Sequence, residues 1–264
     1  MSDPREVLDR PAPPPQVTVA YGSRADQIAD VWLPAISHGL VVYVHGGFWR
    51  AEWDRTHARP LANALLAEGY TVATIEYRRT GQEGGGWPGS FDDVALAFDS
   101  VPQLVTRVAG ADPGPVVLAG HSAGGHLVLW GAVRHRLPAG VPWRLANPPA
   151  VAGVLALAPV SELADAYQRR LGDGAVAELL GGGPEAHPDR YAATDPAALP
   201  APDVPVVLVH GALDDRVPVA QSQRYPAPLV ELPEVEHFGV IDPLSPAWPA
   251  VVEALRSLVR AGDT

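Results

Sequence analysis

The chain has 264 residues, of which 30 are acidic and 19 are basic, so the formal net charge is −11. All the basic residues are arginines, and neither lysine nor cysteine occurs. Disulfides, thiolate nucleophiles, Schiff-base chemistry and lysine-containing phosphate loops are therefore excluded. The chain is acidic and its arginines are scattered, so we expect no nucleic-acid partner.

The first segment, residues 1–16, contains the run PAPPP at residues 11–15, which favours extended backbone. We expect an extended N-terminal arm followed by a single domain over residues 17–264. The first residues carry no apolar run of the kind that a signal peptide needs. The longest apolar stretches, such as residues 150–160, are too short to cross a bilayer. We therefore expect a soluble cytoplasmic protein with no membrane partner.

Short apolar runs alternate with helical patterns along the rest of the chain. Strands are predicted over residues 16–21, 27–33, 39–44, 71–77, 115–119, 151–157, 205–209 and 229–232, and helices over residues 60–69, 91–108, 123–135 and 245–260. The first two strands form an expected hairpin, and Pro102 predicts a kink or a break in the second helix. Strands that alternate with helices predict a mostly parallel sheet covered on both faces.

One connection, residues 161–204, is longer than those usually found in compact domains. It contains two short helical patterns and a glycine-rich turn. Long connections of this kind are either lids over a site or plain excursions over the surface. We favour a lid or cap, because the segment falls between the motifs described next.

Ser122 is the candidate nucleophile, in the sequence GHSAG at residues 120–124. The motif follows a predicted strand and opens a predicted helix, which is the context that a G-x-S-x-G elbow requires. Side chains at Gly120 and Gly124 would collide with the neighbouring strand and helix. The amide of Ala123, at the helix N-terminus, is expected to point toward a developing oxyanion. A bare motif also arises by chance in a chain with 26 glycines, but the flanking elements argue against chance here.

The second motif is HGGFW at residues 45–49, directly after the third predicted strand. Its glycines let the backbone bend, so the amides of Gly47 and Phe48 are expected to join Ala123 in an oxyanion hole. His45 is expected to brace this loop. Phe48 and Trp49 are candidates for substrate contact, although Trp49 also fits a place in the core.

The remaining motifs supply an acid and a base. The sequence HGALDDRVP at residues 210–218 follows a strand, and its G-x-x-D-x-x-V-P pattern favours Asp214 as the acid over Asp215. His237 is the candidate base, since it comes last in the chain order that this arrangement uses. It would take the proton of Ser122 while Asp214 holds its ring. The other histidines show no ligand spacing, so we expect neither a metal nor a cofactor.

Together with EYR at residues 76–78, these motifs resemble the kynurenine formamidase (arylformamidase)-like and carboxylesterase branch of the α/β-hydrolase superfamily. The likeness covers roughly residues 25–260. It implies an α/β-hydrolase fold with a mostly parallel sheet of about eight strands, helices on both faces and a short lid. It also implies a Ser-His-Asp triad that transfers an acyl group to water without a cofactor. Phe48 departs from the pattern, because tyrosine is common at its position in that branch.

The sequence thus predicts a serine hydrolase that acts on a small ester or aryl formamide, most like N-formylkynurenine. A general carboxylesterase or thioesterase is the first alternative. A binding protein that keeps the fold without turnover is a further one. The sequence is also compatible with a homodimer.

Overall fold

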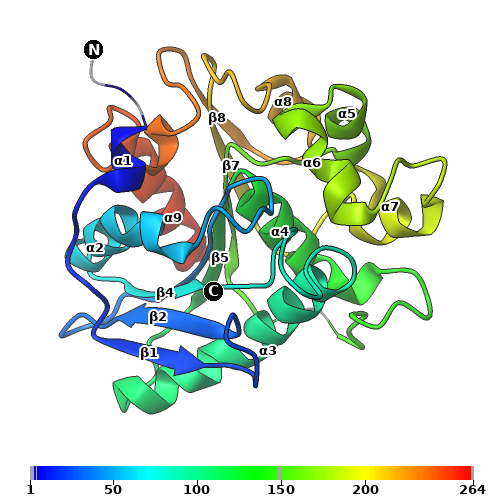
Figure 1. Cartoon of the computed structure of the whole chain (residues 1–264). Coiled ribbons are helices and arrows are strands. Elements are labelled where there is room, and N and C mark those ends of the chain that lie inside the picture. Colours follow the sequence, from blue (N-terminus) through cyan, green and yellow to red (C-terminus); the bar gives the residue numbers. More distant parts are fainter. Residues whose placement is uncertain (1–2, 4, 148–149, 263–264) are drawn as a thin grey trace.

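The structure is a computed structural model that describes residues 3, 5–147 and 150–262. It is built around one eight-stranded sheet with the order β1-β2-β4-β3-β5-β6-β7-β8 (Figure 1). The strands are β1 Val17–Ala20, β2 Ile28–Trp32, β3 Leu40–Val44, β4 Thr71–Ile75, β5 Val116–His121, β6 Gly153–Leu157, β7 Val206–Gly211 and β8 Leu229–Leu232. Strands β3 to β8 are parallel, and the predicted hairpin of β1 and β2 adds an antiparallel edge.

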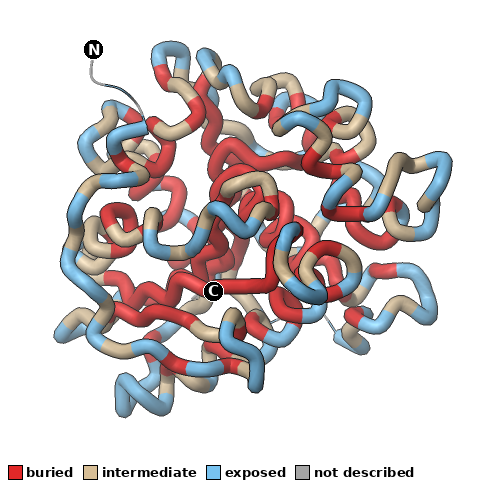
Figure 2. Tube along the Cα trace, in the orientation of Figure 1, coloured by how far each residue is buried: buried red, intermediate tan, exposed pale blue. Residues whose placement is uncertain are grey.

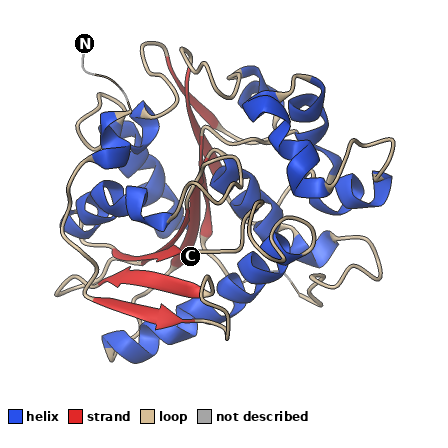
Figure 3. Ribbon diagram, viewed as in Figure 1, coloured by secondary structure: helices blue, strands red, loops and turns tan. Residues whose placement is uncertain are grey.

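Helices cover both faces of the sheet, as predicted (Figure 3). Helices α2 (Arg59–Ala67) and α9 (Trp248–Gly262) pack on one face, and α3 (Gly89–Ala109) and α4 (Ala123–Ala132) pack on the other. The central strands are therefore buried on both sides, and Figure 2 shows the buried residues concentrated along them. This explains why every residue of β3 is hydrophobic and buried.

Helix α3 runs as one helix through Pro102, so of the predicted kink or break the break does not occur. Its inner face, which includes Val94, Val101 and Val105, is fully buried. Packing of this face stabilises the helix beyond what its local sequence favours.

The long connection is mainly helical. It contains α5 (Leu163–Gln168), α6 (Leu171–Leu180), α7 (Pro188–Thr194) and the 3₁₀ turn η3 (Pro196–Ala198). Three consecutive residues, 172–174, take left-handed backbone at the start of α6, so the regular helix begins after them. Glu178 accepts two hydrogen bonds from Arg50, both 2.8 Å long, which fix α6 to the loop after β3.

The remaining helical segments are short: α1 (Glu6–Asp9), η1 (Arg55–Ala58), η2 (Arg134–Arg136), α8 (Ala220–Arg224) and η4 (Gly239–Ile241). The arm that was expected to be extended thus contains one helical turn. Of the helices in the described ranges, none combines the length and apolar character that crossing a bilayer requires.

Candidate active site

The predicted functional residues lie at one edge of the sheet, where the parallel strands end. Val44, the last residue of β3, is in register with Gly120 near the end of β5. The HGGFW turn and the serine elbow therefore leave the sheet side by side. The loop that carries Asp214 follows β7, and His237 follows β8. Ligands bind at this edge in open α/β sheets because the loops converge there.

Ser122 sits in a strained backbone conformation, with φ of 56° and ψ of −117°. Three hydrogen bonds fix this elbow: the Ser122 amide donates to the Leu157 carbonyl, and the Ser122 carbonyl accepts from the amides of His126 and Val160. Such strain persists only where the surrounding structure holds it, and it clusters at functional sites. The residue is 2% exposed, and it lines a cavity.

The glycines beside Ser122 are required by close packing. A Cβ at Gly124 would lie 2.0 Å from the carbonyl oxygen of Val44 in β3, and one at Gly120 would lie 2.3 Å from the carbonyl oxygen of Gly124. The collisions expected with the neighbouring strand and helix are thus confirmed. The two glycines let helix α4 start directly against the sheet.

Replacing Gly124 by Ala is expected to lower the free energy of unfolding by about 3 kcal/mol, the upper end for overpacking. The backbone of β3 must move to admit the methyl group. Gly140→Ala is the matched control: it has space around it and carries only the cost of its φ of 88°, about 1 kcal/mol. Urea unfolding of both variants measures the difference. Equal losses would contradict the steric explanation.

The HGGFW loop has an unusual backbone. Gly47, Phe48 and Trp49 follow one another with φ values of 109°, 51° and 56°. Within the described residues, no group accepts a hydrogen bond from the amides of Gly47 or Phe48. The Ala123 amide is at the first position of helix α4, where it has no intrahelical acceptor. These three amides, expected as an oxyanion hole, remain available to an incoming oxygen.

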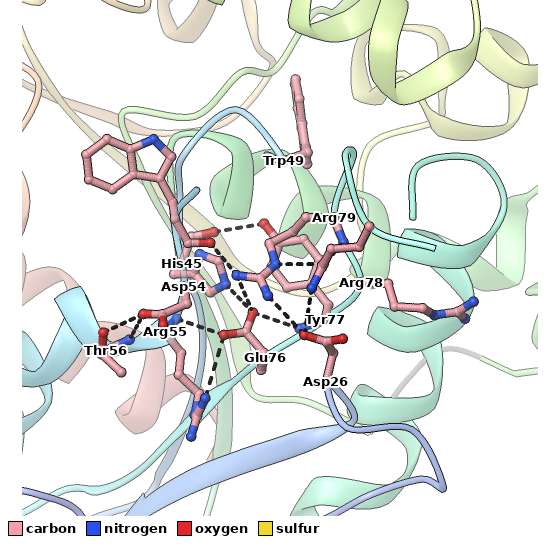
Figure 4. Close-up of polar contacts among 12 residues, drawn as sticks. Asp26, His45, Trp49, Asp54, Arg55, Thr56, Glu76, Tyr77, Arg78 and Arg79 are labelled. Carbon is pink, nitrogen blue, oxygen red and sulfur yellow. Dashed lines mark hydrogen bonds and ion pairs between the residues drawn. The ribbon is translucent and has the colours of Figure 1, made fainter. Parts of the chain in front are cut away.

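His45 lies beneath this loop and holds it (Figure 4). One ring nitrogen is 2.9 Å from Glu76 Oε1 and the other is 2.8 Å from the Gly46 carbonyl oxygen. Glu76 also accepts from the Arg55 amide and pairs with Arg79 at 3.2 Å. Burial would raise the pKa of the Glu76 carboxyl, but these positive and donor groups outweigh it and lower that pKa. His45 therefore braces the loop and does not face the cavity.

Asp214 and His237 are in direct contact. His237 Nδ1 is 2.6 Å from Asp214 Oδ2, and the Asp214 side chain is completely buried. The neighbouring Asp215 has a side chain that is 75% exposed and pairs only with Arg216 in the described chain. The structure thus brings together Asp214 and His237, the pair favoured by the sequence pattern.

Three further groups hold the Asp214 carboxylate. Oδ1 accepts from the amides of Arg216 and Val217, both at 2.8 Å, and His210 Nε2 is 3.0 Å from Oδ2. Burial alone would raise the pKa of Asp214, but the hydrogen bonds from His210 and His237 outweigh it and hold that pKa well below its usual range. Asp214 is therefore a fixed anion beside His237.

Ser122 and His237 line the same cavity, whose volume is about 180 Å³. No hydrogen bond joins their side chains in this structure, and such contacts are often long before a substrate binds. The backbone around His237 is fixed by His121, whose Nε2 is 3.0 Å from the His237 carbonyl oxygen. Burial lowers the pKa of His121 well below its ordinary value, so its ring is neutral beside the cavity.

Phe48 lines the cavity, as expected, but Trp49 does not. Trp49 is 0% exposed, and its ring packs edge-on against His126 at 5.3 Å. The left-handed backbone at positions 47–49 turns successive side chains in different directions, so Phe48 faces the cavity while Trp49 enters the core. The expected substrate contact by Trp49 is corrected accordingly.

Several cavity residues were missed by the sequence analysis. They come from separate segments: Arg5 and Leu8 near the N-terminus, His57 in η1, Arg216 after β7, Phe238 after His237, and Gly172 with Asp173 in the long connection. Burial lowers the pKa of His57 to about 3, so this wall residue is neutral. Arg216 lies within the HGALDDRVP motif and Phe238 directly follows His237, whereas the other positions belong to no local motif. Among the described residues, no group of three His, Asp or Glu side chains could hold a metal ion.

The chain has relatives among known proteins. Residues 29–229 match the family described as BD-FAE. Esterase LipQ of Mycobacterium tuberculosis is 26% identical over 238 residues, which are 83% of this chain and 56% of LipQ. The chain thus spans little more than half the length of this relative.

Two solved structures have the same fold. Esterase B from Lactobacillus rhamnosis superimposes with a TM-score of 0.76 at 21% identity, over 98% of this chain and 90% of that one. A putative thioesterase from Silicibacter sp. superimposes with a TM-score of 0.63 at 28% identity, over 94% of this chain and 87% of that one. Since the family match covers most of the chain and the structural neighbours share its fold, the chain belongs to the BD-FAE family of α/β-hydrolase esterases.

Proposed function

We propose that the protein is a serine hydrolase that cleaves a small ester or aryl formamide through an acyl-enzyme on Ser122. The observation that carries this proposal is the 2.6 Å contact of Asp214 with His237, which lines the same cavity as the strained Ser122. Asp214, His237 and Ser122 then act as the acid, base and nucleophile of a triad. Family membership and the esterase relative support the same reaction class.

In this proposal each group has a role that the geometry supports. Asp214 accepts from His237 Nδ1, which leaves Nε2 as the nitrogen that can take the Ser122 proton. Ser122 Oγ then attacks the carbonyl carbon, and the resulting oxyanion accepts hydrogen bonds from the amides of Gly47, Phe48 and Ala123. Protonated His237 gives its proton to the leaving group. A water molecule activated by His237 finally releases the acyl group from Ser122.

The finer proposal is an activity like that of N-formylkynurenine formamidase. The motifs HGGFW and GHSAG support it, and Phe48 and Trp53 provide aromatic walls for an aryl group. A cavity of about 180 Å³ favours a small acyl group such as formyl. A carboxylesterase is the alternative that LipQ and Esterase B favour, and the Silicibacter neighbour favours a thioesterase.

A comparison of kcat/KM for N-formylkynurenine, p-nitrophenyl butyrate and butyryl-coenzyme A tests these activities. The formamidase proposal expects the formamide to be preferred by at least about tenfold, a difference of about 1.4 kcal/mol in transition-state binding. Preference for the butyrate ester would replace the formamidase proposal by a carboxylesterase, and preference for butyryl-coenzyme A would replace it by a thioesterase. The absence of all three activities, with no labelling of Ser122 by a fluorophosphonate, would favour a binding protein on this fold.

A further inference from the structure

The N-terminal segment is attached to the active-site end of the molecule. Residues 5–10, which we call the N-terminal strap, include the helical turn α1. Figure 1 shows α1 beside the segment that leads into α9. Val7 is 1% exposed and belongs to the hydrophobic cluster that also contains Val240, Ile241 and Ala58. A buried valine this near the start of the chain indicates a docked segment, because a loose arm would expose it.

An ion pair strengthens this attachment. Both terminal nitrogens of Arg10 donate to the two carboxylate oxygens of Asp242, with the Nη2–Oδ2 distance at 2.9 Å. Asp242 lies five residues after His237, at the end of η4. Farther along, the Asn63 side chain donates to the Pro13 carbonyl oxygen at 2.9 Å. The strap is therefore tied to the loop that carries the candidate base.

The inner side of the strap faces the cavity. Arg5 and Leu8 line the cavity, together with Ser122, His237 and Phe238. Val7, between them, points into the core. This separation is what a single helical turn produces, since neighbouring side chains point about 100° apart. The match to the BD-FAE family begins at residue 29, so this wall lies outside the matched region.

We propose that the N-terminal strap is a specificity element, in which Leu8 limits the length of the substrate chain that the cavity accepts. The proposal rests on the proposed function, because it concerns the substrate of Ser122. A cavity of about 180 Å³ has little spare room, so the volume of one leucine side chain matters. Each methylene group that enters an apolar pocket changes binding by several-fold, at about 0.8 kcal/mol. Shortening Leu8 makes room for such groups, and enlarging it removes room.

The test uses Leu8→Ala and Leu8→Trp in the full-length chain. Their kcat/KM values are measured on p-nitrophenyl acetate and octanoate, and on ethyl and octyl butyrate, to vary the acyl and the alcohol side separately. For each series we take the ratio of kcat/KM for the long substrate to kcat/KM for the short one. In at least one series, Leu8→Ala is expected to raise this ratio by about fivefold, and Leu8→Trp is expected to lower it. Leu96→Ala is the matched control, since Leu96 is on α3 outside the cavity. Unchanged ratios in both series for both variants would overturn the proposal.

A second measurement follows the strap itself. Trypsin can cut after Arg5, whereas Pro11 protects the bond after Arg10. Arg10→Gln is expected to speed cleavage after Arg5 by up to about fivefold, because it removes an ion pair worth up to about 1 kcal/mol. An unchanged rate would show that the strap is not tied through Asp242. This readout needs no turnover, so it separates a failure of the strap from a failure of the proposed function. If Ser122 does not react with a fluorophosphonate and no ester is cleaved, the proposed function fails instead.

Discussion

Replacing Ser122 by Ala is expected to lower kcat by at least about a thousandfold, as in other triads that lose their nucleophile. In the proposed mechanism no acyl-enzyme can form without Oγ, and only the three candidate oxyanion amides and substrate binding remain to assist water. The residual rate should therefore stay above that of the uncatalysed reaction. Single-turnover kinetics and covalent labelling by a fluorophosphonate measure the two consequences. Wild type should be labelled at Ser122, and the variant should not be labelled.

Ser161→Ala provides the control for this change. Ser161 is buried like Ser122, with 1% of it exposed, and its hydroxyl has no hydrogen-bond partner in the described part of the chain. It lies after β6 and outside the cavity that contains Ser122. Loss of the Ser161 hydroxyl should therefore leave both turnover and labelling near wild-type values. A kcat of Ser122→Ala within about tenfold of the wild-type value would contradict the acyl-enzyme mechanism.

The strands and loops that carry the candidate site residues could be predicted from the sequence, because each has a local sequence signal. β3 and β5 are short apolar runs that end in glycine-containing motifs, and β8 has the predicted limits Leu229–Leu232. The turn pattern G-x-x-D-x-x-V-P favours Asp214 over Asp215. In the structure, Asp214 is enclosed by two amides and two imidazoles, while Asp215 faces solvent. Local pattern and tertiary environment agree at these positions.

The cavity walls could not be predicted in the same way. Leu8, His57 and Gly172 are brought together only by the folding of remote segments. Trp49 and Phe48 are adjacent and chemically similar, so only the backbone dihedral angles decide which one enters the core. Helix α3 passes through Pro102 because its buried face outweighs a local cost. In each case packing decided an outcome that residue type alone left open.

Replacing one or the other of the adjacent aspartates Asp214 and Asp215 is expected to have very different effects on kcat. Asp214→Asn is expected to lower kcat by about 10³- to 10⁴-fold, as when the acid of a triad becomes an amide and the imidazole takes the wrong tautomer. Asp215→Asn changes the same charge on a side chain that is 75% exposed, and it should change kcat less than about twofold. Steady-state kinetics of the two variants decide between them. A larger loss in Asp215→Asn would assign the acid role to Asp215.

The same pair of variants should also separate in stability as the pH falls. The hydrogen bonds from His210 and His237 hold the pKa of Asp214 below its ordinary value in the folded state. A carboxyl with a lowered pKa stabilises the fold above its unfolded-state pKa, which is about 3.9, and this contribution is lost as the pH falls toward the folded-state value. Asp214→Asn lacks that contribution, so its urea midpoint should fall less steeply than that of wild type below about pH 4. Asp215→Asn should keep the wild-type slope, since Asp215 faces solvent. Parallel slopes in all three proteins would show that Asp214 gains no stabilisation from its two histidines, and they would remove the electrostatic basis for its role beside His237.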